Sequence, residues 1–179
     1  MRQMILLFLL LLFATGSNTA KAQIKKLPDM KIQQLDLNWV NTKNICDSND
    51  LTIVAFWATW CKYCISELNA IDALYPSWQK QCNVKLYAVD IDIADDLAKV
   101  KNKVAQTNWK YEILLDNEML LTEAMKMDNP PYTYLLNRNG EVLWEHNGYS
   151  PGDELILQEK IREFHKSIKN ATIPGSTVK

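Results

Sequence analysis

Two cysteines separated by two residues follow closely on an apolar segment of the chain. Residues 51–57 are almost entirely apolar, and the motif Cys61-x-x-Cys64 begins four residues later. Apolar side chains then recur at helical spacing as far as Trp78. This order predicts a buried strand, a short turn and a helix that begins at the first cysteine. The pattern therefore indicates an α/β fold in which both thiols lie at one end of a strand.

The spacing of the two cysteines suits redox chemistry. Thiols three positions apart can close a small disulfide ring, and the start of a helix surrounds the sulfur of Cys61 with partial positive charge. That charge favours the thiolate, which is the form of cysteine that attacks disulfides. Cys61 is therefore the expected nucleophile, and Cys64, one turn further in, is expected to resolve the mixed disulfide. The sequence predicts a thiol–disulfide oxidoreductase.

The first residues of the chain have the layout of a secretory signal. A short basic start precedes an apolar run over residues 4–14, and small residues lead to Ala22. We expect residues 1–22 to be a signal peptide, and the alternative is an uncleaved membrane anchor. The mature protein is then expected in the periplasm or elsewhere outside the cytoplasm, where disulfides persist.

The rest of the chain is long enough for one domain. Its 179 residues are 47% hydrophobic, which supports a core, and the net charge of −1 gives no electrostatic reason to expect nucleic acid as a partner. Residues 23–50 are interpreted as an N-terminal extension with one or two edge strands, residues 51–170 as the folded domain, and residues 171–179 as a flexible tail.

Strands and helices alternate through the predicted domain. Strands are expected at 51–57, 84–91, 110–115, 132–136 and 142–145, and helices at 61–81, from about 92 to 106, at 117–127 and at 151–168. Pro76 should kink or break the first helix. The segment 137–140, with its Asn-Gly pair, indicates a tight hairpin between the last two strands. The order predicts a mixed sheet with helices on both faces.

These landmarks resemble those of the thioredoxin superfamily, and within it the TlpA/ResA-type extracytoplasmic thiol–disulfide oxidoreductases. The resemblance covers about residues 51–168. It is carried by the segments 56–64, 131–136 and 139–142 together with Glu67 and Gly148. It implies a thioredoxin-like α/β fold, a central mixed β-sheet flanked by helices. An extra strand–helix unit is expected between Cys64 and Pro131.

A carboxyl group near the dithiol is a candidate for proton transfer. Glu67 lies three residues after Cys64 and so shares its helix face. Partial burial would raise its pKa into the range useful for taking the Cys64 proton. The resemblance implies the same role, and the alternative is an ordinary surface glutamate.

Other residues are expected to bind the substrate. The resemblance implies that Pro131 is the cis-proline beside the dithiol, with a backbone that pairs with an extended substrate segment, and Tyr132 follows it. Trp60 adjoins Cys61 and is expected to form a wall for the substrate, whereas Trp57 belongs to the core. The remaining tryptophans are interpreted as packing residues: Trp39, Trp78, Trp109 and Trp144.

Two departures from the family pattern leave the direction of electron flow open. Asn69 stands where the helix of the family commonly has proline. Tyr63 stands where the family usually has proline before the second cysteine, and Lys62 adds positive charge beside Cys61. Both changes could stabilise the thiolate and make the disulfide more oxidising. The alternatives to a reductase are therefore an oxidase or isomerase with the same fold. A metal-binding module without catalysis is disfavoured by the absence of a third ligand. A peroxidase is disfavoured because peroxide-reducing relatives have a different loop around a single attacking cysteine.

Two further cysteines lie outside the motif. Cys46 and Cys82 each precede a predicted strand, and parallel neighbouring strands would bring both to the sheet edge opposite the active site. We expect a structural disulfide between them, with two buried unpaired thiols as the alternative.

The resemblance also implies partners. Protein disulfides are the expected substrates, a membrane thiol protein is the expected electron donor, and cytochrome c maturation is one pathway that uses such proteins. The chain is expected to be a monomer without a cofactor other than the Cys61–Cys64 disulfide.

Overall fold

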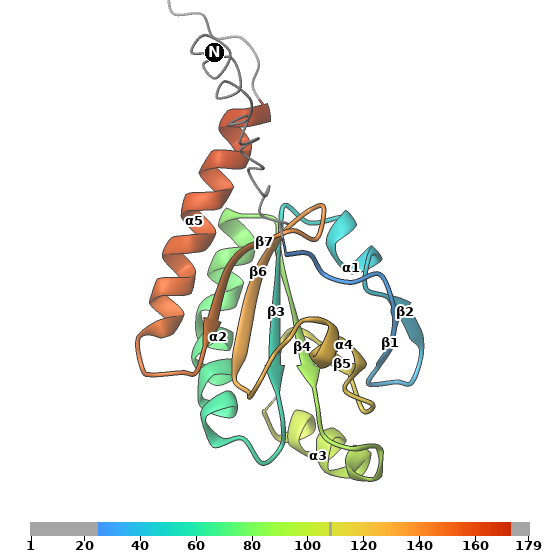
Figure 1. The fold of residues 1–179 in the computed structure, drawn as a ribbon. Coiled ribbons are helices and arrows are strands. Elements are labelled where there is room, and N and C mark those ends of the chain that lie inside the picture. Colours follow the sequence, from blue (N-terminus) through green and yellow to red (C-terminus); the bar gives the residue numbers. More distant parts are fainter. Residues whose placement is uncertain (1–24, 108, 173–179) are drawn as a thin grey trace, which may run out of the picture.

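The computed structural model describes residues 25–107 and 109–172, which form one seven-stranded sheet with helices on both faces (Figure 1). The expected signal peptide and most of the expected tail lie outside these residues. In chain order the elements are β1 (Lys31–Gln34), β2 (Trp39–Asn41), α1 (Asn44–Asp47), β3 (Leu51–Trp57), α2 (Lys62–Gln81), β4 (Val84–Asp90), the 3₁₀ helix η1 (Ala94–Asp96), α3 (Leu97–Thr107), β5 (Glu112–Leu115), α4 (Leu120–Ala124), β6 (Tyr132–Asn137), β7 (Val142–Asn147) and α5 (Asp153–Thr172).

The sheet is mixed, and its strand order is β2-β1-β5-β4-β3-β6-β7. β3 lies inside it, parallel to β4 and antiparallel to β6. Every residue of β3 is buried. A strand covered on both faces needs apolar side chains at every position, which explains the continuous apolar run in its sequence. The expected mixed sheet is confirmed.

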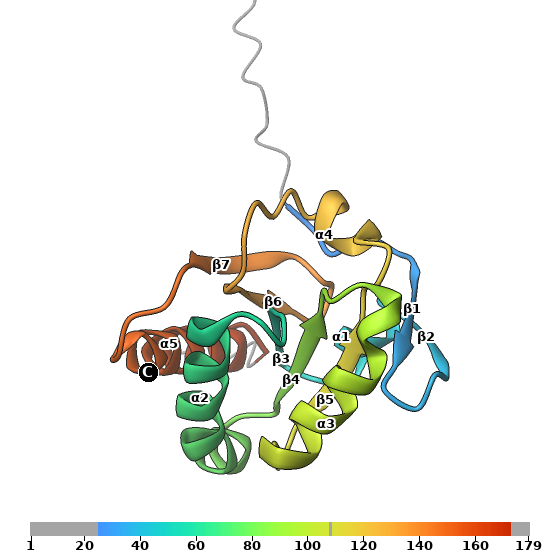
Figure 2. The same cartoon turned by 90° about the horizontal axis from the view of Figure 1, so that it is seen from below.

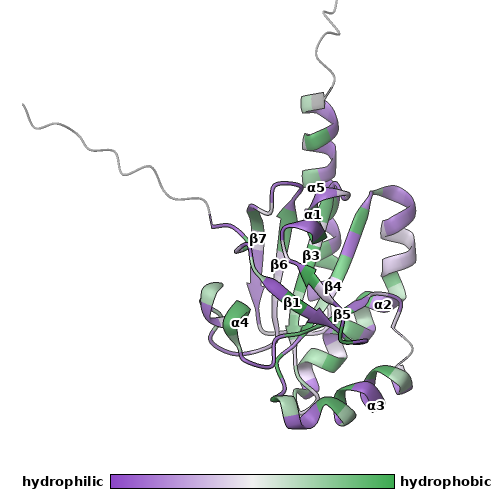
Figure 3. Cartoon of the chain, turned by 90° about the vertical axis from the view of Figure 1, so that its right-hand side faces the viewer, coloured by the Kyte–Doolittle hydropathy of each residue, from purple (hydrophilic) through white to green (hydrophobic). Residues whose placement is uncertain are grey.

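Helices cover both faces of this sheet. α2 and α5 pack against each other on one face, where the indole Nε1 of Trp78 donates a 2.9 Å hydrogen bond to Gln158. α4 lies on the other face (Figure 2). Figure 3 shows hydrophobic residues along β3 and an alternation of hydrophobic and hydrophilic residues along α3, as expected for a buried strand and an amphipathic surface helix.

The segment before β3 extends the sheet. β1 and β2 form a hairpin, and β1 pairs with β5, so the expected one or two edge strands are confirmed. The expectation that Trp39 packs in the core is wrong, since 63% of its surface is exposed. β2 is the outermost strand of the sheet, and Trp39 lines an open hollow with residues of β1 and α4.

Some predicted boundaries differ from the structure. α2 runs through Pro76 to Gln81, so the proline does not break it. α4 is shorter than the expected helix over 117–127, because Met119 adopts a left-handed backbone conformation (φ 57°) and the helix begins after it. The hairpin between β6 and β7 is confirmed, with Gly140 at φ 75° in its turn.

β5 and α4 supply the extra strand–helix unit expected between Cys64 and Pro131. None of the helices in the described part of the chain is both long enough and apolar enough to cross a membrane.

Candidate active site

The two cysteines of the motif form a disulfide at the junction of β3 and α2. Cys61 is the N-cap of α2, and its Sγ accepts a 3.2 Å hydrogen bond from the backbone N–H of Cys64. This sulfur therefore faces the unpaired N–H groups and the positive end of the helix dipole, which stabilise a thiolate once the disulfide is opened.

The two sulfurs differ in their access to solvent. The Cys61 side chain retains 7% of its exposed surface, whereas Cys64 is completely buried. A partner molecule can therefore reach only the first sulfur, and the second can act only on a species already bound to Cys61.

Glu67 lies on the buried side of α2, one turn beyond Cys64. Its carboxylate accepts a 2.8 Å hydrogen bond from the hydroxyl of Thr133 in β6. Burial raises the pKa of Glu67 to about 7, and the hydrogen bond from Thr133 opposes that rise only in part. The alternative of a surface glutamate is excluded, and the carboxyl group can exchange a proton near neutral pH.

The peptide bond between Pro130 and Pro131 is cis. Pro131 is buried directly before β6, and its carbonyl oxygen accepts a 2.8 Å hydrogen bond from the backbone N–H of Gly148. Proline offers no N–H of its own. The expected pairing of Pro131 with an extended substrate stays a prediction. The backbone groups available for such pairing are the second lone pair of the Pro131 carbonyl and the carbonyl of Pro130.

Aromatic side chains flank the dithiol. Trp60 and Tyr63 are each 66% exposed on either side of Cys61, whereas Trp57 is buried and packs edge to face on Trp109 at a ring distance of 5.0 Å. The expected division between a core tryptophan and an exposed one is confirmed. Tyr132 is half-buried and stacks on Tyr134 at 4.7 Å.

Three residues of the site were not apparent from the sequence. Thr133 binds Glu67, and Asp92 accepts two hydrogen bonds from Thr59, close to the first cysteine. Asp90 is buried beside them at the end of β4. The available signal was two aspartates at the carboxyl end of a predicted strand, an edge where ligands and catalytic groups gather.

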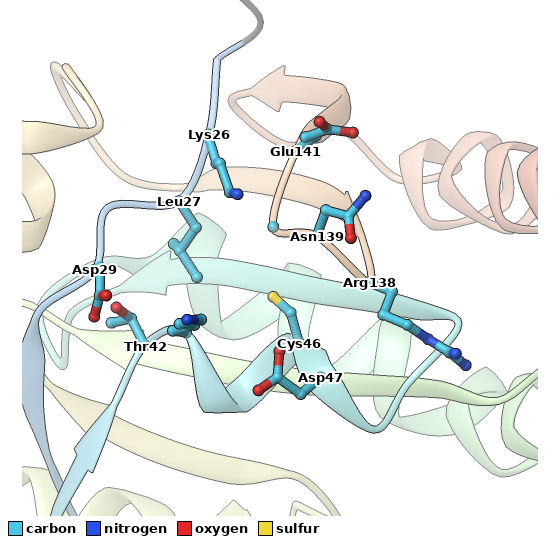
Figure 4. Close-up of a pocket in the computed structure, with 11 residues that line it drawn as sticks. Lys26, Leu27, Asp29, Thr42, Cys46, Asp47, Arg138, Asn139 and Glu141 are labelled. Atoms are coloured by element: carbon cyan, nitrogen blue, oxygen red, sulfur yellow. The ribbon is translucent and has the colours of Figure 1, made fainter.

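The expected disulfide between Cys46 and Cys82 is wrong, because both are free, buried thiols. β3 and β4 are parallel neighbours that start level with each other, as predicted. The thiols nevertheless face different surroundings. Cys46 lies in α1 and faces a pocket of about 450 Å³ beneath the β6–β7 turn (Figure 4), whereas Cys82 lines a hollow beside α5.

Burial raises the pKa of both the Cys46 and the Cys82 thiol, so neither is a reactive thiolate. Within residues 25–107 and 109–172, no group of three or more His, Cys, Asp or Glu side chains could hold a metal ion.

Comparison with known proteins agrees with this geometry. The model of the AhpC/TSA family matches residues 24–145, which include the disulfide-bonded Cys61 and Cys64, Glu67 and Pro131. The chain belongs to the AhpC/TSA family. No curated protein matches the chain.

Solved structures similar to this AhpC/TSA chain have a thioredoxin-like fold. A thioredoxin-like protein from Porphyromonas gingivalis is 33% identical, with a TM-score of 0.71 over 81% of this chain and 95% of that chain. StoA from Bacillus subtilis is 21% identical (TM-score 0.61, 76% of this chain and 98% of that chain). A secreted disulfide oxidoreductase of Mycobacterium tuberculosis is 12% identical (TM-score 0.62, 75% and 96%). At such low identity the last two show the fold alone, and the expected thioredoxin-like α/β fold is confirmed.

Proposed function

We propose that this protein is an extracytoplasmic thiol–disulfide oxidoreductase that reduces disulfides in other proteins. The observation that supports this most directly is the closed Cys61–Cys64 disulfide at the start of α2, with one sulfur accessible and the other buried. Disulfide exchange needs an accessible thiol that is readily ionised, here Cys61 at the N-cap of α2, and a second thiol that resolves the mixed disulfide, here the buried Cys64.

The reaction has two exchange steps. The Cys61 thiolate attacks one sulfur of the substrate disulfide, forms a mixed disulfide and releases the other substrate sulfur as a thiolate, which takes up a proton. The thiol of Cys64 then loses its proton and attacks the sulfur of Cys61. The second substrate thiol leaves, the Cys61–Cys64 disulfide closes, and two electrons have passed to the substrate.

Glu67 is the proton acceptor in the second step. A buried thiol is a weak nucleophile until it is deprotonated, and Cys64 has no solvent at its surface to take the proton. The Glu67 carboxyl group lies on the same helix face, and its pKa of about 7 lets it accept that proton at neutral pH and release it afterwards.

The catalytic cycle requires a second partner. The closed disulfide must be reduced again by a dithiol, and we propose that a membrane thiol protein donates these electrons. No cofactor beyond the Cys61–Cys64 disulfide enters this cycle, and a monomer is sufficient for it. Proteins of cytochrome c maturation are one candidate class of client.

The proposed location rests on residues 1–22, with the layout of a secretory signal. The similar protein of Mycobacterium tuberculosis is described as secreted, which supports the same compartment. Disulfide substrates persist outside the cytoplasm, so the proposed activity and the proposed location agree.

Trapping of the mixed disulfide tests the function. A Cys64→Ala variant expressed in its own cell envelope keeps Cys61 but cannot complete the second step, so substrate proteins should stay covalently attached and separate only after reduction. The matched control is the double variant Cys61→Ala, Cys64→Ala, which should trap none. Equal trapping by both variants, or none by Cys64→Ala, contradicts the proposal.

The reduction potential tests the direction of exchange. The exposed Lys62 and Tyr63 favour the alternative of an oxidase, because positive charge and a freer turn stabilise the thiolate. A potential of about −250 mV or lower supports the reductase, and one near about −120 mV supports an oxidase.

A further inference from the structure

A buried carboxylate holds the segment that leads into Cys61. Asp92 accepts a 2.6 Å hydrogen bond from the backbone N–H of Thr59 and a 2.9 Å hydrogen bond from the Thr59 hydroxyl, one on each carboxyl oxygen. Its own backbone carbonyl accepts a 2.9 Å hydrogen bond from the side chain of Asn117. Asp92 is therefore held in place while both of its oxygens bind a residue two positions before the nucleophile.

A second carboxyl group lies behind the first. Asp90 is fully buried at the end of β4, where it pairs in register with Trp57 of β3. Within the described residues, neither of its oxygens accepts a well-formed hydrogen bond. The charged side chains that act on it are Asp92 and Asp96, and both are acidic.

An ionised carboxylate in such a place is costly, because it is neither hydrated nor paired with a cation. Burial, followed by the side-chain contact with Asp92 and the charge of Asp92, raises the pKa of Asp90 to about 9. As a carboxylic acid, Asp90 has an O–H that can donate to Asp92. One proton therefore gives one oxygen of Asp90 a hydrogen-bond partner and removes the repulsion between two negative charges.

We infer that Asp90 and Asp92 act together as a positioning pair for the dithiol, sharing one proton and one negative charge, with Asp92 holding Thr59 and its charge disfavouring the Cys61 thiolate. This inference rests on the proposed exchange activity. A negative charge near Cys61 destabilises the thiolate form, and it thereby keeps the disulfide less oxidising than the exposed Lys62 and Tyr63 would suggest.

Three substitutions distinguish the effect of the negative charge of Asp92 from the effect of altered packing near Cys61. Asp92→Asn removes the charge, and the equilibrium constant for reduction of the Cys61–Cys64 disulfide by glutathione should rise at least fivefold, which corresponds to about 20 mV. Asp90→Asn preserves a neutral donor of the same shape and should stay within twofold of the unmodified protein at pH 7. Asp95→Asn removes an exposed carboxylate from η1, three residues after Asp92, and is the matched control, for which the equilibrium constant should also stay within twofold.

Each outcome decides between the possibilities. An Asp92→Asn equilibrium equal to that of the unmodified protein overturns the inference, as does an Asp90→Asn shift as large as that of Asp92→Asn, because Asp90 would then carry the charge. If the unmodified protein does not exchange with glutathione at all, the proposed function fails and the inference fails with it.

Where Asp92→Asn does not fold, Thr59→Val supplies the test. It removes one of the two hydrogen bonds to Asp92 and keeps the charge. The alkylation rate of reduced Cys61 should change at least twofold, and an unchanged rate overturns the positioning role.

Discussion

At the scale of single residues, the four cysteines of this chain differ mainly in their surroundings. Cys61 and Cys82 retain 7% and 6% exposure, but only Cys61 lies at a helix N-terminus, whereas burial raises the pKa of the Cys46 and Cys82 thiols and Cys64 is completely buried. Alkylation requires a thiolate that the reagent can reach. The reactivity of the reduced protein should therefore be dominated by one sulfur.

This leads to a first prediction. In the reduced native protein, iodoacetamide at pH 7 should modify one thiol at least about tenfold faster than it modifies free cysteine, because a thiol with a lowered pKa is more fully ionised at that pH. Mass spectrometry of the peptides should place the label on Cys61. A Cys61→Ser variant should lack the fast phase, and a fast phase that survives in it contradicts the assignment.

The proton acceptor gives a second prediction. Glu67→Gln should slow the attack of Cys64 on the mixed disulfide by about 10²-fold or more, the usual effect of losing a general base. In the unmodified protein this step should slow as the pH falls through about 7, because Glu67 is then protonated. Stopped-flow measurement of the second step should show that the variant lacks this inflection.

Glu123→Gln is the matched control, since Glu123 is exposed in α4. Its rate and pH profile should equal those of the unmodified protein. An inflection near pH 7 that persists in Glu67→Gln assigns the proton to another group.

At the scale of elements, long patterned segments were predictable and short ones were not. The apolar run of β3 covers seven residues, and the helical spacing of α2 covers several turns. Patterns of this length identify a strand or a helix from the sequence alone. α4 is only five residues long, and the left-handed backbone at Met119 rather than an apolar pattern sets its start. The helix expected over 117–127 was too long for this reason.

The two isolated cysteines show what strand order cannot give. β3 and β4 do start level with each other, as the sequence indicated. A disulfide also needs side chains that point toward each other within a few ångströms. The short helix α1, which places Cys46 in its own pocket, had no signal in the sequence. The hydrogen-bonded pairs Thr59–Asp92 and Thr133–Glu67 were not predicted either, because each pair joins segments that lie far apart in the sequence.

The β6–β7 hairpin gives a third prediction. Gly140 adopts φ 75°, and a Cβ there would meet the nearest atoms of Leu27 and Lys26 at 3.6 and 3.7 Å, which is ordinary contact. Gly140→Ala should therefore lower the free energy of unfolding by the backbone cost alone, about 1–2 kcal/mol. Urea denaturation measures this change.

Gly140→Asn is the matched variant. Asparagine tolerates the left-handed region better than alanine, so its loss should be smaller. Equal stability of the alanine variant and the unmodified protein would show that the turn relaxes to another conformation.

At the scale of the whole molecule, the chemistry is confined to one end of the sheet. The dithiol follows the carboxyl end of β3, and Asp90 ends the parallel strand β4 beside it. The antiparallel strand β6 begins at the same end, directly after Pro131. Cys46 and Cys82 precede β3 and β4, so they lie at the opposite end. Cys46 and Cys82 are therefore too far from Cys61 and Cys64 to exchange disulfides with them within the folded molecule.

The thiol count gives a fourth prediction. The chain contains four cysteines, and the fully oxidised protein should show two free thiols per molecule when it is unfolded in denaturant, those of Cys46 and Cys82. The reduced protein should show four. Titration with a thiol reagent measures both numbers, and an oxidised protein without free thiols would restore the disulfide between these two residues.

The stability of the oxidised protein should depend on pH through Glu67. Its pKa is raised from 4.5 in the unfolded chain to about 7 in the folded state, so between these values the folded protein binds more protons than the unfolded one. The contribution of Glu67 is therefore fully present below about pH 4.5 and is lost as the pH rises through 7.

A shift of this size corresponds to on the order of 3 kcal/mol. Urea denaturation at pH 4 and pH 8 should show that the stability of the unmodified protein, relative to Glu67→Gln, falls by about this amount. In the difference between the two free energies of unfolding, the contributions of groups that both proteins contain, such as Asp90, cancel. A difference that stays constant between the two pH values would show that Glu67 is ionised in the folded state, and with it the proposed proton acceptor would have lost its raised pKa.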